Sequence, residues 1–169
     1  MIKPIDDFVS AFRAKISLDE TLIVKQQGRY FLLNESLKRL ASKDFFYAGT
    51  YIGKVKDGRF FPSFNLLELI ARKKANKVVI DAKTEWLFIC GRDIFKEGIA
   101  NVTGSTKRDD YTLVVNLHGE CLGFGRILCD LNGKRHGLAI KNMLDVGDFL
   151  RRERQTATVS ARHQIVHAR

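Results

Sequence analysis

The sequence predicts an α+β protein in which a mixed α/β N-terminal half precedes a β-rich C-terminal half. Three observations predict this class. Apolar residues recur at helical spacing near the start, turn signals separate short β-prone runs in the middle, and two longer β-prone runs flank His118-Gly119. Of the 169 residues 45% are hydrophobic, which is enough apolar side chain to form a buried core.

The first predicted element is an amphipathic helix whose first turn contains Pro4. Proline has a fixed φ that suits this position, and two aspartates place negative charge where the helix dipole is positive. One face of the helix carries apolar residues at positions i, i+3, i+4 and i+7, namely Ile5, Phe8, Val9 and Phe12.

Two β-rich segments with tight turns follow. Residues 22–24 and 30–33 predict a hairpin whose turn contains Gly28, and residues 45–55 predict a strand that ends at the Asp-Gly turn of residues 56–59. A glycine next to a short polar residue favours the positive φ angles that tight hairpins require.

Two further helices are predicted in this half. The first covers residues 35–42 and is expected to pack through Leu37, Leu40 and Ala41. The second opens at residues 62–65, continues through four apolar residues, and ends in the cations of residues 72–74, where the helix dipole is negative.

In the second half, residues 77–80 predict a buried strand, and Asp81 and Gly91 predict the N-cap and the stop of a helix. Within that helix, Trp86, Ile89 and Cys90 share one face. Residues 86–89 are also β-prone, and periodicity over so short a run does not decide between helix and strand.

Residues 94–95 and a turn at residues 98–99 follow the helix, and further strands are predicted at residues 111–117, 120–128 and 138–140. Asp145 is expected to cap a last helix with Val146, Phe149 and Leu150 on its inner face.

Charge points to a polyanionic partner. Lys and Arg number 29 against 19 Asp and Glu, which gives a formal net charge of +10 and a pI of about 9.7. RNA, DNA, heparin and an anionic membrane all fit this balance.

No apolar run approaches the length of a membrane span, and the start lacks the order of a secretion signal, so we expect an intracellular protein without membrane contact. Three cysteines, Cys90, Cys121 and Cys129, are expected to be buried thiols in a reducing compartment.

No motif predicts catalysis, a metal or another cofactor. The glycine-rich residues 119–125 lack the spacing of a phosphate-binding loop and fit a hairpin better. His118, Cys121 and Cys129 lack a convincing fourth ligand nearby, and none of the histidines belongs to a nucleophile signature. We therefore expect no enzyme activity and no small-molecule substrate.

The cations of the last helix are the strongest binding signal. Asp148, Arg151, Arg152 and Gln155 share a stripe, and Arg154 continues the positive run. Pairing of Asp148 with one arginine, worth about 0.2–0.5 kcal/mol, is the alternative to phosphate contact, for which the guanidinium fork is well suited. Other cations are dispersed along the same half, and spacing does not tell whether they share a face: Lys83, Arg92, Lys96, Arg126 and Lys141.

Residues 77–81, 86–91, 94–99 and 119–125 together resemble a PUA domain, a small pseudo-barrel of RNA-modifying enzymes and ribosome-assembly factors. Upstream, residues 58–67 and the N-terminal α/β pattern resemble the pre-PUA domain of the Nip-seven family of large-subunit assembly factors, and residues 145–153 resemble that family's C-terminal end. The resemblance implies a pre-PUA domain followed by a PUA pseudo-β-barrel. The lysine-rich residues 72–77 predict the boundary, which gives domains at residues 1–75 and 76–155 and a basic tail at 156–169 that we expect to be mobile.

The resemblance implies an RNA-binding adaptor in large ribosomal subunit biogenesis and pre-rRNA processing. Its partners would be RNA, in particular pre-rRNA, and pre-ribosomal assembly proteins. It would be cytoplasmic in a prokaryote and nucleolar in a eukaryote. The alternatives are an accessory subunit of an RNA-modifying enzyme and a protein interaction module that does not bind RNA.

The resemblance also implies that RNA follows the cleft between the helix near Trp86 and the last strand, touching the Gly98-Ile99 loop. Together with the charge pattern it gives eight candidate RNA-binding residues: Lys83, Arg92, Lys96, Gly98, Lys141, Arg151, Arg152 and Arg154.

Overall fold

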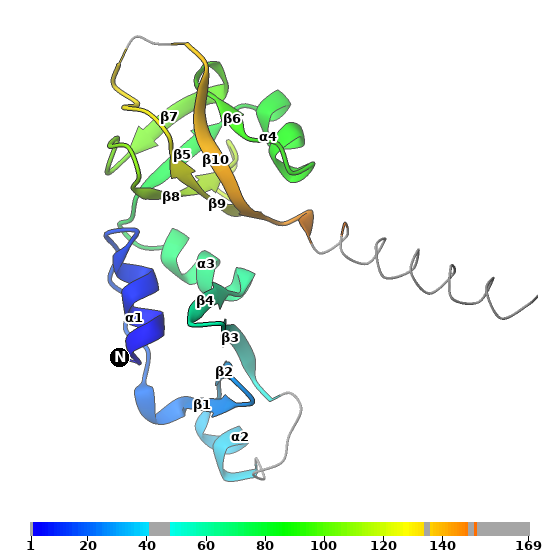
Figure 1. Cartoon of the computed structure of the whole chain (residues 1–169). Helices are drawn as coiled ribbons and strands as arrows, with labels where there is room; N and C mark the ends of the chain where they lie inside the picture. Colours follow the sequence, from blue (N-terminus) through cyan, green and yellow to red (C-terminus); the bar gives the residue numbers. More distant parts are fainter. Residues whose placement is uncertain (1, 41–47, 134–135, 149–150, 152–169) are drawn as a thin grey trace, which may run out of the picture.

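The computed structural model describes residues 2–40, 48–133, 136–148 and 151. In Figure 1 a small sheet with its helices forms the lower part of the molecule, and a curled sheet forms the upper part. The α+β class is confirmed.

The N-terminal sheet has four antiparallel strands in the order β1-β2-β3-β4. These strands are β1 (Ile23–Gln26), β2 (Arg29–Leu32), β3 (Thr50–Lys56) and β4 (Arg59–Pro62). Both hairpin turns have two residues at positive φ, 50° and 75° at Gln27 and Gly28 and 51° and 71° at Asp57 and Gly58. Such pairs match the right-handed twist of the strands they join, and both predicted turns are confirmed.

Two helices, α1 (Lys3–Ser10) and α3 (Phe64–Ala71), pack on one face of this sheet. The N-terminus of α3 is capped by Ser63, whose Oγ accepts a hydrogen bond from Leu66 N at 3.2 Å. Both helices lie where the sequence predicts them.

The prediction for the second helix and its following strand is only partly right. Helix α2 (Glu35–Leu40) ends at Leu40, whose surface is 82% exposed, so packing through Leu40 is wrong. A helix of six residues has fewer than two turns, and only Leu37 on it is partly buried. Ala41 and residues 45–47 lie outside the described part of the chain, and β3 begins at Thr50 rather than at residue 45.

The second sheet has six strands in the order β6-β10-β9-β8-β5-β7 and curls into a half-barrel, with the β5–β8 pair parallel and the others antiparallel (Figure 1). The strands are β5 (Lys77–Ile80), β6 (Ile94–Phe95), β7 (Ile99–Thr103), β8 (Tyr111–Val115), β9 (Cys121–Ile127) and β10 (Leu138–Asp145). Helix α4 (Ala82–Ile89) follows β5, and the 3-10 helix η2 (Lys96–Gly98) precedes β7; another, η1 (Glu20–Leu22), precedes β1.

Two strands differ from the sequence prediction. Strand β7 was not predicted, and β10 continues to Asp145 rather than ending at residue 140. In β7 only Ile99 and Val102 are even partly buried, and β10 carries Lys141 and Asn142 in its centre, so neither has a continuous apolar run.

The two halves of the molecule share a core. Phe124 of β9 packs edge-on against Phe8 and Phe12, with ring centroids 5.6 and 5.7 Å apart. At the junction the buried Asn76 donates from Nδ2 to Tyr111 O at 3.1 Å and accepts from Ser105 N at 2.9 Å through Oδ1. An ion pair of 3.1 Å between Arg13 and Asp110 adds a surface link.

Candidate functional site

Helix α4 is held at both ends by the residues that the sequence predicted. Asp81 Oδ1 accepts a hydrogen bond from Thr84 N at 2.7 Å, and this bond is the main reason that the pKa of Asp81 is lowered. At the other end Gly91 has a φ of 88°, and the following Arg92 donates from N to Leu87 O at 3.0 Å.

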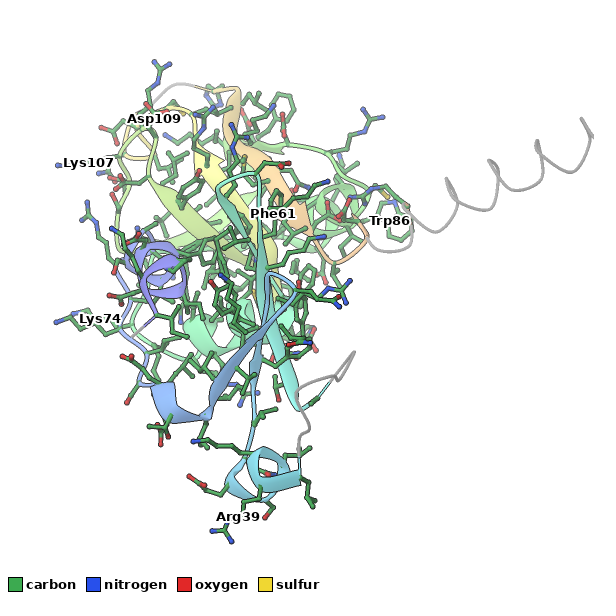
Figure 2. The ribbon with its side chains drawn as sticks, turned by 60° about the horizontal axis from the view of Figure 1, so that its bottom comes forward. Arg39, Phe61, Lys74, Trp86, Lys107 and Asp109 are labelled. Carbon is green, nitrogen blue, oxygen red and sulfur yellow. The ribbon has the colours of Figure 1, made fainter. Side chains whose placement is uncertain are left out.

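The outer face of α4 carries a stripe of exposed side chains, which we call the α4 stripe: Lys83, Trp86, Leu87 and Cys90 at i, i+3, i+4 and i+7. Trp86 is 69% and Leu87 42% exposed, while Phe88 on the other side is fully buried in the barrel core. In Figure 2 Trp86 lies at the right-hand edge of the molecule. The expectation that all three cysteines are buried is therefore wrong for Cys90, because the Phe88 side of the helix packs on the barrel. It is only partly right for Cys121 and Cys129, which are both partly buried.

The C-terminal end of α4 is tied to β10 by a network that we call the Asp145–Arg151 clamp. Asn142 Nδ2 donates to Phe88 O at 3.0 Å, and Arg151 Nη1 donates to Ile89 O at 2.5 Å. Both side chains also donate to Asp145 Oδ2, at 3.0 and 2.6 Å. The clamp thus supplies a donor to Ile89 O at the end of the helix and a second donor to Phe88 O, which also accepts from Gly91 N at 2.8 Å.

Asp145 therefore has a different role from the predicted helix cap. It is the last residue of β10. Asp148 and Arg151 are helical, and Arg151 N donates to Gly147 O at 3.1 Å, so the predicted last helix is present at its described residues but begins after Gly147 and not at Asp145. Val146 is exposed rather than on an inner face, while Phe149 and Leu150 are outside the described residues. The prediction failed because Asp145 is bound by a guanidinium six residues away.

The clamp also engages Arg151, one of the candidate RNA-binding residues. Its side chain is 37% exposed and lies 4.0 Å from Asp148, against 2.6 Å from the buried Asp145. The hydrogen bond to Asp145 is the main reason that the pKa of Arg151 is raised. A contact between Arg151 and phosphate stays a prediction, and Arg152 and Arg154 fall outside the residues whose placement is described.

The other candidate residues are divided between two surfaces. Lys83 lies near the start of the α4 stripe, and Arg92 is exposed just beyond its end, two residues after Cys90. Lys141 pairs with Arg126 across β10 and β9, and because residues alternate along a strand it points away from the barrel core that α4 covers. The structure therefore separates Lys141 from the stripe.

Lys96 and Gly98 belong to η2, next to the start of α4. Lys96 is half-buried, whereas Gly98 is buried, and a Cβ there would lie 2.0 Å from Thr84 Oγ1. Close packing against α4 explains the glycine at this position. Participation of Lys96 and Gly98 in RNA binding stays a prediction.

A hollow of about 310 Å³ lies between the end of α4 and β10, where the resemblance implied a cleft; Cys90, Gly91 and Met143 are among its lining residues. Among the described residues no group of three or more His, Cys, Asp or Glu side chains could hold a metal ion. No helix in the described part of the chain is long and apolar enough to span a membrane.

A family model, the UPF0113 PUA domain, matches residues 76–154. Among solved structures, a conserved PUA domain protein from Thermoplasma acidophilum is 21% identical, with 89% of this chain and 92% of that chain covered and a TM-score of 0.58. A PUA domain from Aeropyrum pernix K1 is 17% identical, with 89% and 85% covered and a TM-score of 0.56.

NSun6 from Pyrococcus horikoshii is 19% identical, with a TM-score of 0.39; the match covers 41% of this chain and only 19% of that protein. No curated protein matches the chain. The first two structures share the curled half-barrel and the α/β half that precedes it along nearly the whole chain. Residues 76–154 of this protein therefore match the UPF0113 PUA domain in sequence, and the fold of the chain is that of the two PUA domain structures.

Proposed function

We propose that this protein is an RNA-binding adaptor in large ribosomal subunit biogenesis and pre-rRNA processing, and that it holds RNA on the α4 stripe of its PUA domain without catalysing a reaction. The observation that carries the proposal is Trp86, a large aromatic side chain that is 69% exposed between Lys83 and Arg92. Leu87 beside it is also exposed, and contiguous exposed apolar side chains mark interaction sites more often than single ones do.

The stripe has the chemistry of a site for unpaired RNA. An aromatic ring offers a face on which any base can stack, worth about 1–3 kcal/mol per base, and cations beside it bind the phosphates. Lys83 and Cys90 are seven residues apart, which is about 10 Å along the helix axis. A short stretch of single-stranded RNA fits this length.

The ribosomal part of the proposal rests on the resemblance to the Nip-seven family and on the net charge of +10. Pre-rRNA and pre-ribosomal assembly proteins are the proposed partners. The proposed location is the cytoplasm if the source is prokaryotic and the nucleolus if it is eukaryotic.

Titration of a fluorescent single-stranded RNA at several salt concentrations tests RNA binding. The affinity is expected to fall steeply with salt, and Trp86→Ala is expected to weaken it about 5- to 150-fold, the equivalent of one lost base stack. Trp86→Phe keeps an aromatic face and is the matched control, whereas Trp86→Leu keeps only apolar area. Equal affinities for the alanine, leucine and phenylalanine variants would exclude stacking on this residue.

Crosslinking the protein to RNA in its own cells, followed by sequencing of the attached fragments, tests the ribosomal part. Enrichment of large-subunit rRNA precursors is the expected result. A spread over messenger RNAs would refute the ribosomal role, and the absence of any attached RNA would favour a protein interaction module.

A further inference from the structure

The N-terminal sheet has an outer face that α1 and α3 do not cover. Tyr30, Ile52 and Phe60 point to the helices and belong to the shared core. Residues that alternate with them along β2 and β4 point the other way. Among these Phe31 of β2 is fully buried, whereas Arg59 and Phe61 of β4 are exposed, so the open part of this face lies on the β4 side.

A set of cations and one aromatic ring lie on this outer face. Arg29 of β2 pairs directly with Lys54 of β3, and Lys54 pairs with Phe61 of β4. In the next row Lys56 pairs with Arg59. We call these five residues the basic face.

A β-bulge brings Lys54 to this side. Ile52 and Lys54 would share a face in a regular strand, yet Ile52 is fully buried in the core. The register between β2 and β3 shifts at this point, with Tyr30 opposite Gly53 and Phe31 opposite Tyr51. One extra residue in a strand reverses the direction of the side chains that follow, which is a common way to aim a side chain at a functional surface.

On the basic face, positively charged side chains lie directly opposite one another on neighbouring strands. Like charges directly across a pair of strands destabilise a sheet, and this face has two such pairs, Arg29 with Lys54 and Lys56 with Arg59. Asp57 in the turn is the acid nearest to them in sequence. Within the described residues Lys54, Lys56 and Arg59 form no ion pair at 4.0 Å or less. Lys56 and Arg59 therefore face each other without an ion-pair partner among the described residues, and a broken local rule of this kind is typical of a binding site, where a ligand supplies the missing charge.

The aromatic ring beside these cations narrows the choice of ligand. Phe61 is 44% exposed on β4, the edge strand of the sheet, and has no polar atom in its side chain. A sheet surface that presents cations around an exposed aromatic ring suits single-stranded nucleic acid, because the ring stacks on a base while the cations bind phosphates.

We propose that the basic face is a second RNA-contact surface, which binds single-stranded RNA with a base on Phe61 and phosphates on Lys54, Lys56 and Arg59. The choice of RNA as the polyanion rests on the proposed function; the location of the surface does not. One RNA that reaches both the basic face and the α4 stripe gains affinity from the link between the two contacts. The N-terminal half then contributes to RNA binding as well as to protein contacts.

The test uses the full chain and a uridine oligomer of about 20 nucleotides, long enough for more than one contact. The variant Lys54→Thr/Arg59→Thr removes one cation from each row and replaces it with a residue that favours strands. Lys73→Gln/Lys74→Gln removes the same charge from the exposed residues after α3; Lys74 projects from the left edge of the molecule in Figure 2, well away from Phe61.

The threonine double variant is expected to lower the slope of log affinity against log salt by about 1.4, since each phosphate contact to a single strand contributes about 0.7. The lysine control is expected to leave the slope nearly unchanged. Phe61→Ala should weaken binding about 5- to 150-fold, and Phe61→Tyr should not. Loss of opposed charges should leave the melting temperature of the threonine variant equal or higher, which separates lost binding from unfolding.

A uridine oligomer with 4-thiouridine, crosslinked by ultraviolet light, is expected to attach to the tryptic peptide of residues 60–72, which contains Phe61.

If the basic-face variants bind like the wild type while Trp86→Ala does not, this inference is overturned and the proposed function stands. If the wild type binds no RNA, the proposed function fails, and RNA as occupant of the basic face fails with it. Polyglutamate, titrated in place of the uridine oligomer, serves as a model of an acidic protein. If the basic-face variants lose binding to polyglutamate but bind RNA like the wild type, the surface serves an acidic protein and the RNA assignment is overturned.

Discussion

Replacement of Arg151 by alanine tests whether this residue stabilises the fold or is available to RNA. The substitution removes the donors to Asp145 Oδ2 and Ile89 O and leaves the Asp145 carboxylate, 3% exposed, with Asn142 as its donor. Loss of one partner of a buried ion pair costs about 3–5 kcal/mol. Because the Arg151 side chain is 37% exposed and water can replace part of the interaction, we expect a loss of about 2–3 kcal/mol in the free energy of unfolding.

For a chain of 169 residues this loss corresponds to a fall in melting temperature of about 5–10 °C, measurable by thermal and urea unfolding. Arg92→Ala, which removes an exposed arginine from the same end of α4, is the matched control and should melt within about 1 °C of the wild type. Asp145→Asn in the Arg151→Ala background should recover part of the loss, since no uncompensated carboxylate is then buried. An Arg151→Ala protein that melts like the wild type but binds RNA less tightly would refute the clamp and restore Arg151 as a phosphate contact.

Two further outcomes follow from the buried side chains. Asn76→Ala leaves the backbone groups of Tyr111 and Ser105 without their partner and should lower the free energy of unfolding by about 2–4 kcal/mol in urea titrations; a loss below about 1 kcal/mol would show that water replaces the amide. Burial raises the pKa of Cys121 to about 11 from an ordinary value of 9.0, so iodoacetamide at about pH 8 should label the exposed Cys90 much faster than Cys121 in the native protein. Equal labelling rates for the two cysteines would contradict the burial of Cys121. The folded protein keeps the Cys121 thiol protonated up to about pH 11, whereas the unfolded chain loses this proton above pH 9, so the contribution of this thiol to the free energy of unfolding falls as pH rises from 9 to 11.

The elements that the sequence predicted well are those defined by local chemistry. Gly28 and Gly58 mark turns because their φ angles are positive, and Ser63 and Asp81 mark helix starts because their side chains accept from amides three residues ahead. Each of these signals involves neighbours along the chain, so one sequence is sufficient to read them.

The candidate site was predicted less well, because charge alone does not tell where a side chain points. Lys83 and Lys141 looked equivalent in the sequence, yet one lies on the α4 stripe and the other points away from the barrel core. The exposure of Trp86 was likewise not predicted, since Phe88 on the same short helix competes for the core and only the barrel decides which ring is buried.

The sequence by itself determined the α+β class, the positions of most elements and the positive charge, since periodicity, turn residues and composition are properties of short segments or of the whole chain. Tertiary structure decided the Asp145–Arg151 clamp, which joins β10 to a helix more than 50 residues earlier in the chain. It also decided the basic face, which exists only because β2, β3 and β4 pair in one register with a bulge before Lys54. Register and long-range packing depend on all the strands together, and a shift of one strand by a single residue would turn the cations of that strand toward the core.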